Sequence, residues 1–388
     1  MPFSARVGFF AQLPAAGAAY PNWPTQATPS EFTTEGALLS GTPTAFNYYD
    51  PGNLIPASGE QFRGVLQHPN GNIYFLPRQF DSILELEPSS VTTTERDPAA
   101  AIGTNNEYTG GALGGNGNIY LNPFDFGTVI YEYNPVNQTA RTGNFGATIS
   151  TGSGDRRIGA VTDTTGNVHC IPLNATTVIK IDCSAEPVTA SNKNYGATWG
   201  GARYVGGTAH PNGNIYCMPL NGNNVLEFDP VNETSTTVAT PTTASGQFQG
   251  AVTGADGKIY GVPWNADYVT VYDPDTGDIA EQTWGLSMSF SSAYIGGVSA
   301  PNGNIYMVPF AKREMLEIDP VANTASFIST LIFDDANGAK FVGGCSDETG
   351  NVYFAPNQRG DFGVLTTNAT GGTNANAYTL SSYTNKGF

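Results

Sequence analysis

Short runs of alternating apolar and polar residues recur along the chain. In residues 225–229 (VLEFD) the apolar Leu226 and Phe228 alternate with the acidic Glu227 and Asp229, the pattern of a strand with one buried face. A second kind of run, NIYxxP, ends in a proline that cannot donate a hydrogen bond to a neighbouring strand. No helical periodicity lies between these runs. The pattern therefore predicts a protein built from short β-strands.

These runs belong to a unit that occurs seven times. Residues 68–77 read HPNGNIYFLP and residues 210–219 read HPNGNIYCMP. A turn glycine marks each copy, and a proline, called here the repeat proline, stands six residues after it. The glycines are Gly71, Gly117, Gly166, Gly213, Gly257, Gly303 and Gly350, and the prolines are Pro77, Pro123, Pro172, Pro219, Pro263, Pro309 and Pro356. Seven copies, 44 to 49 residues apart, are typical of a propeller or a solenoid.

Each copy divides into four predicted strands. The first contains glycine, as in YVGG at 204–207, which indicates close backbone approach near a central axis. An Asn-Gly, Asp-Gly or Thr-Gly turn leads to the NIYxxP strand, and a variable loop leads to the alternating strand. An Asp-Pro turn then opens a Thr-rich fourth strand. Four strands repeated seven times predict an all-β fold, a seven-bladed β-propeller, with a linear β-solenoid as the alternative.

The repeat also predicts how the chain is divided. Residues 44–367 form the propeller, with a strand at 44–50 (TAFNYYD) completing the seventh blade; the alternative closing strand is at 377–381. Residues 1–43 are interpreted as an N-terminal arm and residues 368–388 as a C-terminal tail. Arms of this length suggest docking to the propeller itself or to a neighbouring subunit.

Composition supports short strands and excludes some partners. The chain of 388 residues has 47 Gly and 26 Pro, and only 13% of it is charged. Its net charge of −17 and the lack of clustered Lys and Arg argue against nucleic acid as a partner. Because no run of eighteen apolar residues exists, we expect no membrane insertion. The four cysteines are expected to be buried free thiols.

The sequence offers little for catalysis. His68 and His210 precede the same PNGNIY motif, which predicts turn residues, and His169 replaces a repeated tyrosine. No nucleophile elbow, zinc motif, P-loop or dinucleotide fingerprint stands in a fitting context. We therefore predict no catalytic residue, no metal site and no cofactor.

The variable loops after the repeat prolines are the predicted binding surface. They share one rim of the disc with the connections between blades, and they carry aromatic, amide and charged side chains that suit sugars or a protein partner. The alternative is that these rings only cover the core. The candidate residues are Phe80, Phe124, Phe126, Asn174, Trp199, Arg203, Asn221, Trp264, Asn265, Asp267, Tyr268, Phe310, Arg313, Asn357 and Arg359.

The layout of GNIY or DGKIY followed by Asp-Pro resembles the streptogramin-lyase-like and the NHL or YVTN-type propellers over residues 60–366. This resemblance implies a propeller, and for the lyases a His and a Glu near the axis. Those lyases carry Thr-Glu after the aromatic strand, where this chain has Leu76-Pro77 or Met218-Pro219, and no histidine matches the catalytic one. The variant PNGNIYxxP with the ending LSSYTNKGF is also similar to propeller proteins of bacteriophage virions.

Three functions follow as hypotheses. The first is a non-enzymatic virion protein on a phage capsid or tail, with arms that dock to other virion proteins or to further copies of the chain and a rim that contacts host surface glycans. The second is a propeller enzyme, a lyase or hydrolase of the streptogramin-lyase type. The third is a secreted or cytoplasmic scaffold for protein partners.

Overall fold

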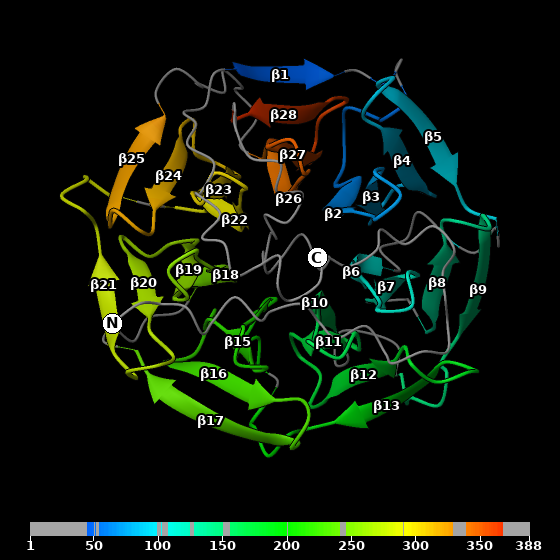
Figure 1. Ribbon diagram of the computed structural model, residues 1–388, viewed down its shortest axis with the longest axis horizontal. Coiled ribbons are helices and arrows are strands. Elements are labelled where there is room, and N and C mark those ends of the chain that lie inside the picture. The colour runs from blue at the N-terminus through cyan, green and yellow to red at the C-terminus, as the bar shows by residue number, and fades with distance from the viewer. Residues whose placement is uncertain are drawn as a thin grey trace, which may run out of the picture.

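The computed structural model describes residues 45–49, 51, 54–98, 102, 108–124, 128–149, 156–199, 201–240, 246–289, 291–328 and 339–367. Within these ranges the strands form seven antiparallel sheets of four strands each. The sheets stand as blades around a common axis (Figure 1). The chain is thus a seven-bladed β-propeller, as its repeat predicts. The described part contains no helix long and apolar enough to cross a membrane.

Blades 1 to 6 each consist of four consecutive strands. From the axis outward, blade 1 has β2 (Phe62–Gln67), β3 (Ile73–Pro77), β4 (Ile83–Glu87) and β5 (Thr92–Arg96); blade 2 has β6 (Tyr108–Leu113), β7 (Ile119–Pro123), β8 (Ile130–Asn134) and β9 (Thr139–Gly143); blade 3 has β10 (Arg157–Thr162), β11 (Val168–Pro172), β12 (Val178–Asp182) and β13 (Thr189–Lys193). Blade 4 has β14 (Thr208–Ala209), β15 (Ile215–Cys217), β16 (Asn224–Asp229) and β17 (Thr234–Ala239); blade 5 has β18 (Phe248–Thr253), β19 (Ile259–Pro263), β20 (Val269–Tyr272) and β21 (Ile279–Gln282); blade 6 has β22 (Tyr294–Ser299), β23 (Ile305–Pro309), β24 (Met315–Asp319) and β25 (Thr324–Ile328).

Blade 7 joins the two ends of the described chain. Its inner strands are β26 (Phe341–Ser346), β27 (Asn351–Pro356) and β28 (Phe362–Thr366), and its outermost strand is β1 (Ala45–Tyr49). Tyr49 of β1 lies opposite Phe362 of β28, and their rings stack with centroids 5.5 Å apart. A strand from residues 44–50 therefore completes the ring, as expected. The alternative strand at 377–381 and the predicted arms at 1–43 and 368–388 lie outside the described residues.

The innermost strands are bent by a glycine. In β10 the pairing with β11 shifts between Arg157 and Ala160, and the intervening Gly159 has a φ of 79°. This is a β-bulge in a backbone conformation that favours glycine. Every blade has a positive-φ glycine at this place: Gly64, Gly110, Gly159, Gly206, Gly250, Gly296 and Gly343. The glycine of each first strand thus lets seven strands converge on the axis.

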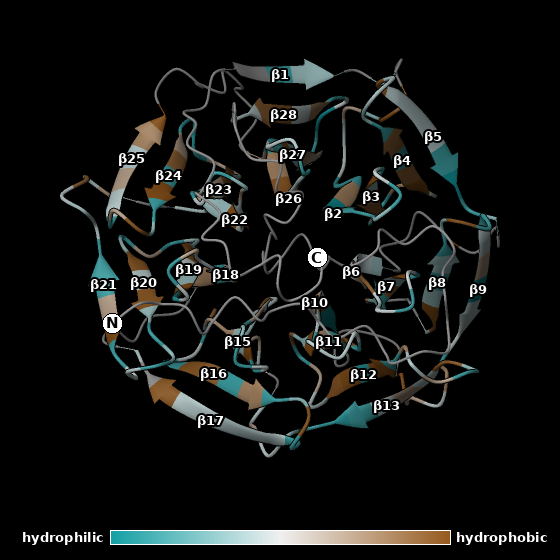
Figure 2. Cartoon of the chain, in the orientation of Figure 1, coloured by the Kyte–Doolittle hydropathy of each residue, from teal (hydrophilic) through white to brown (hydrophobic). Residues whose placement is uncertain are grey.

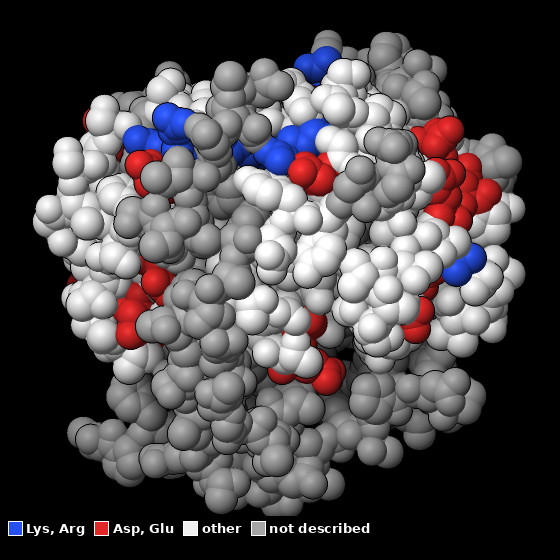
Figure 3. Space-filling view, turned by 90° about the horizontal axis from the view of Figure 1, so that it is seen from above, with Lys and Arg blue, Asp and Glu red and all other residues white. Residues whose placement is uncertain are grey.

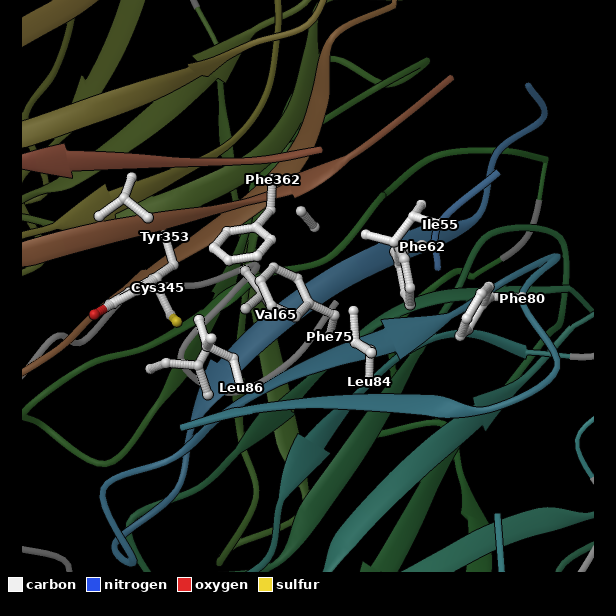
Figure 4. Close-up of a cluster of buried hydrophobic side chains, with 13 residues drawn as sticks. Ile55, Phe62, Val65, Phe75, Phe80, Leu84, Leu86, Cys345, Tyr353 and Phe362 are labelled. Atoms are coloured by element: carbon white, nitrogen blue, oxygen red, sulfur yellow. The ribbon is translucent and has the colours of Figure 1, made fainter. Parts of the chain in front are cut away.

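The core lies between neighbouring blades. One cluster joins β2 and β3 of blade 1 to β26, β27 and β28 of blade 7 (Figure 4). In it Phe75 packs on Phe362 with ring centroids 5.1 Å apart. The outermost strands contribute less to this core. β5 and β9 are mostly exposed, and the colours of Figure 2 show them as less hydrophobic than the strands inside them. All four cysteines are free and buried in this core, as predicted.

Candidate functional site

The two ends of the blades have different roles. The connector rim comprises the segments from each repeat proline to the next strand, the connections between blades, and the first two residues of each innermost strand. The opposite end, called here the turn face, comprises the Gly-containing turns and the Asp-Pro turns. Strand direction alternates within each blade, so the loops that vary between copies all lie on the connector rim.

His68 and His210 hold adjacent blades together on the turn face. His68 Nδ1 accepts a hydrogen bond from the Asn70 backbone N–H, so its Nε2–H donates to the Gly117 carbonyl of blade 2, 3.0 Å away. His210 makes the same pair of contacts, with Asn212 N and, at 2.8 Å, with Gly257 O of blade 5. Both side chains are buried. They occupy equivalent positions in the turns of blades 1 and 4, as their sequence context predicted.

His169 is enclosed in blade 3. Its Nε2 lies 2.8 Å from Asp163 Oδ2, and its Nδ1 lies 3.0 Å from the Tyr195 hydroxyl. Burial alone would raise the pKa of Asp163, but its hydrogen bond to His169 and the charge of that ring hold it below the ordinary value. His169 is 0% exposed and Asp163 is 1% exposed. All three histidines of the chain are therefore occupied in buried contacts.

The repeated tyrosine explains most acidic residues inside the blades. In six blades its hydroxyl donates to a carboxylate at 2.7 to 2.9 Å. The pairs are Tyr74–Glu85, Tyr120–Glu132, Tyr216–Glu227, Tyr260–Asp256, Tyr306–Glu317 and Tyr353–Asp347. In blade 3 the His169–Asp163 pair takes their place. The NIY motif thus provides a buried hydrogen-bond anchor for each blade.

An aromatic mouth surrounds the axis at the connector rim. The residue directly after each repeat proline contributes to it: Arg78, Phe124, Leu173, Leu220, Trp264, Phe310 and Asn357. Five of these pack together with the innermost strands in one apolar cluster, in which Trp264 and Phe310 lie 5.1 Å apart between ring centroids. Asn357 is fully buried, and neither its Nδ2 nor its Oδ1 has a partner among the described residues.

Cations surround this mouth. The guanidinium carbons of Arg78 and Arg156 lie 5.6 and 5.4 Å from the centroid of the Phe124 ring. Contacts of this kind hold the planar cations against the aromatic face. Burial lowers the pKa of Lys340, and the nearby charge of Arg313 lowers it further. Arg78 also forms an ion pair with Glu60, so part of the positive charge at the mouth is neutralised there.

Among the described residues of the connector rim, Lys and Arg outnumber Asp and Glu, although the chain as a whole is acidic. Of the fourteen Lys and Arg residues that are described, nine lie on this rim: Arg63, Arg78, Arg156, Arg157, Arg203, Lys312, Arg313, Lys340 and Arg359. Six described acidic residues lie there as well: Glu60, Asp81, Asp97, Asp267, Glu314 and Asp361. Figure 3 views the disc from the side, and most of the visible Lys and Arg atoms lie toward the top of the picture, on one face of the disc. In a chain with a net charge of −17, the described part of the connector rim thus carries more positive than negative side chains.

Among the predicted site residues, the structure brings Phe124, Trp264, Phe310 and Asn357 to the mouth. Three other rings lie within or against the core instead. Phe80 packs on Phe62 at 4.9 Å, Trp199 donates to Asn194 O at 2.7 Å, and Tyr268 lies against Phe248 at 5.9 Å. Phe126 lies outside the described residues.

Three of the four predicted amides occupy one repeated position, two residues after the repeat proline. Asn221 Oδ1 accepts from Gly246 N at 2.8 Å and Asn265 Oδ1 accepts from Ser292 N at 2.9 Å, so both fasten a connection between blades to a rim loop. Asn174 holds the equivalent place in blade 3. Whether these amides also contact a ligand stays a prediction.

The predicted charged residues are distributed around the outer part of the rim. Asp267 and Arg313 are exposed. Arg359 pairs with Asp361 at 2.7 Å and lies over the ring of Tyr48, with its guanidinium carbon 4.3 Å from the centroid. Arg203 is half-buried beside Tyr204. Sequence reasoning did not select Arg78, Leu173 or Leu220; the signal for them was their shared place after the repeat proline.

Comparison with known proteins supports the fold. No protein-family model and no curated protein match the sequence. Streptogramin B lyase has a similar structure, with a TM-score of 0.64, 14% identity, and coverage of 83% of this chain and 98% of that one. A catalytically inactive virginiamycin B lyase from Staphylococcus aureus, solved with quinupristin, matches with a TM-score of 0.64, 12% identity, and coverage of 83% and 99%.

Hydrazine synthase of Kuenenia stuttgartiensis is also similar, with a TM-score of 0.56, 13% identity, and coverage of 82% and 99%. Identities this low establish the shared propeller fold, while activity must be argued from the site itself. Within the described ranges, no group of His, Cys, Asp and Glu is arranged to hold a metal ion.

Proposed function

We propose that this chain is a non-enzymatic binding propeller that uses its connector rim to contact surface glycans. The observation that supports this most strongly is the contrast between its two ends. The residues of the turn face that could support acid–base chemistry are engaged in buried contacts between and within blades. The connector rim instead gathers cations and aromatic rings.

The chemistry of the mouth suits sugars. The rings of Trp264 and Phe310 offer flat apolar faces, against which the C–H face of a sugar ring packs. Arg78 and Arg156 supply cationic donors for hydroxyl or carboxylate oxygens beside them.

A glycan array tests this proposal. The wild-type protein is expected to bind a subset of glycans, and Trp264→Ala is expected to weaken that binding at least tenfold. Val231→Ala is the matched control, since Val231 is an exposed apolar residue in an Asp-Pro turn of the turn face. A protein that binds no glycan, or a Trp264→Ala variant that binds like Val231→Ala, would contradict the proposal.

The setting that we propose is a virus particle, on which the propeller is displayed and its arms dock to neighbouring virion proteins. The repeat motif PNGNIYxxP, the C-terminal sequence LSSYTNKGF and the Gly-, Asn- and Thr-rich composition support it. Mass spectrometry of purified particles from the source culture is the test. Stoichiometric peptides of this chain are expected, and their absence from particles alongside soluble protein would contradict the virion role. Deletion of residues 1–43 is then expected to abolish incorporation.

A lyase-type enzyme is the second candidate, and the structural likeness to streptogramin B lyase motivates it. All three histidines of this chain are buried in contacts that hold blades together, which argues for the binding role. Incubation of the purified protein with quinupristin tests the enzyme directly. We expect the compound to be recovered unchanged, and its conversion would favour the lyase.

A further inference from the structure

One pocket lies on the connector rim between blades 3 and 4, and it differs from the equivalent places beside blades 3 and 6. It has a volume of about 330 Å³ and lies between the connection at residues 194–199 and the outer strands of blade 4. It is lined by Gly196, Ala197, Thr198, Arg203, Tyr204, Asn224, Leu226, Ser235, Thr236 and Thr237.

The connection over this pocket has a close copy one blade earlier. Residues 144–149 read NFGATI and residues 194–199 read NYGATW. In the earlier copy the connection lies against β13: Ala190 N donates to Phe145 O and Thr148 N donates to Asn192 Oδ1, both at 2.6 Å. A Cβ added to Gly146 would meet Ala190 O at 3.1 Å. The space is closed there.

In the later copy Tyr195 and Trp199 pack on Phe228 of β16, but the described backbone between them is not hydrogen-bonded to β17. Ser235 and Thr237 of β17 replace Ala190 and Asn192, as the strand pairings with Phe228 and Leu226 show. Neither of the two closing hydrogen bonds of the earlier copy forms among the described residues here. Because threonine is shorter than asparagine, Thr237 does not reach the connection, and the pocket stays open.

A third copy shows another way of closing the space. Between blades 5 and 6 the residue equivalent to Thr237 is Phe327, which pairs with Leu316 in the register that Thr237 has with Leu226. Phe327 packs against the apolar cluster that contains Trp284. The opening beside Thr237 therefore reflects the residues of blade 4 and is not a general property of the fold.

The lining of the open pocket combines one cation with hydroxyl groups. Arg203 is half-buried, and no carboxylate in the described residues pairs with its guanidinium. Thr198, Ser235, Thr236 and Thr237 contribute hydroxyls, and Leu226 gives an apolar floor. A single guanidinium fits one carboxylate through two parallel hydrogen bonds. The volume lies at the small end of ligand pockets and suits one sugar ring.

We propose that this pocket binds a pyranose ring that carries one carboxylate, with Arg203 holding the carboxylate and the hydroxyl side chains holding the ring. Such rings occur as hexuronic acids and as sialic acids. The inference rests on the proposed function, since it assigns acidic glycan recognition to one pocket of the connector rim.

The test measures binding of three small sugars by ligand-observed NMR titration: glucuronate, N-acetylneuraminate and the neutral methyl glucoside. One of the two acids is expected to bind at least tenfold more tightly than methyl glucoside, and the acid that binds identifies the source. Arg203→Gln is expected to weaken that binding at least tenfold.

Two further variants separate pocket closure from loss of charge or fold. Thr237→Asn introduces the side chain that closes the equivalent space in blade 3 and is expected to weaken binding without lowering the melting temperature. Lys258→Gln removes a charge on the turn face and should leave binding unchanged. Equal binding by wild type and Arg203→Gln, or no preference for the acids over methyl glucoside, would overturn the proposal that this pocket binds an acidic sugar. If the array still detects glycans, the proposed function survives that failure; if the array is also negative, both fail.

Discussion

Gly159 of blade 3 and Gly206 of blade 4 touch across the axis-facing ends of their blades, so that a Cβ added to Gly159 would lie 2.7 Å from the Gly206 Cα. The Gly206 N–H also donates to Ile158 O at 3.0 Å. Neighbouring blades thus meet backbone to backbone here, with no room for a side chain. This contact excludes a side chain at Gly159, and the positive φ of the equivalent glycine in every blade favours glycine there as well.

Gly159→Ala is therefore expected to destabilise the ring. Both a positive φ of 79° and a clash with backbone atoms oppose it, and we expect a loss of at least about 3 kcal/mol in the free energy of unfolding. Gly285→Ala is the matched control because Gly285 has a φ of 75° and nothing within 4 Å of an added Cβ, so about 1 kcal/mol is expected. Urea denaturation measures both. Equal losses would refute the clash.

Stability should fall in mild acid because of His68. Burial lowers the pKa of His68 below its ordinary value of 6.5, against the smaller effects of its hydrogen bonds with Asn70 and Gly117. Below pH 6.5 His68 therefore binds a proton more readily in the unfolded chain than in the folded one. The contribution of neutral His68 to the free energy of unfolding is complete above pH 6.5 and is lost as the pH falls below that value. Urea denaturation between about pH 5 and 8 should show a smaller slope for His68→Gln than for wild type. Identical slopes would be inconsistent with this role.

His169 should tolerate the residue that the other blades use. Blade 7 contains the same loop chemistry, with Tyr353 donating to Asp347 Oδ2 at 2.8 Å where blade 3 has His169 and Asp163. His169→Tyr is therefore expected to lower the free energy of unfolding by less than about 1.5 kcal/mol, the approximate value of one lost hydrogen bond. His169→Ala should cost about 2 to 4 kcal/mol, because it opens a cavity and removes the His169 hydrogen bond from the buried Oδ2 of Asp163.

Thermal and urea unfolding of the two variants provide the measurement, and glycan binding at the connector rim should be unchanged in His169→Tyr. If His169→Tyr proved as damaging as His169→Ala, the ring nitrogens of His169 would have a role beyond packing and hydrogen bonding.

The closing strand should contribute to stability through Tyr49. Its ring stacks on Phe362 at 5.5 Å, across the pairing of β1 with β28. Tyr49→Ala is expected to lower the free energy of unfolding by about 1 to 2 kcal/mol, since it removes a cross-strand aromatic pair. Asn47→Ala changes an exposed residue of the same strand and should lower it by less than about 0.5 kcal/mol. Calorimetry compares them, and similar values would show that β1 adds little to the closed ring.

The fold could be predicted from the sequence because the same local signals recur in every copy. The Asn-Gly turn before Gly71, the strand that ends at Pro77 and the alternating run at 225–229 each indicate one strand or turn, and repetition makes them consistent. The strand at 44–50 could be placed because its distance from the first copy matches the spacing of the other outer strands.

The candidate site was harder to predict because similar residues in the rim loops point in different directions. Phe124 and Phe80 both follow a repeat proline, yet the first lies at the mouth and the second packs on Phe62 in the core. The difference is a shift of two positions in the loop. Likewise, the open pocket beside Thr237 depends on how closely one connection approaches one strand, which is a property of tertiary packing.

The central claim is that the repeat builds the blades and that ligand contact is made on the connector rim. Hydrogen–deuterium exchange of the protein with and without a glycan selected on the array tests it most directly. We predict slower exchange in peptides covering residues 78–82, 196–204, 220–223, 264–268 and 310–314, with the turns at 68–72 and 210–214 unchanged. Protection confined to the turn face, with unchanged exchange on the connector rim, would contradict the account.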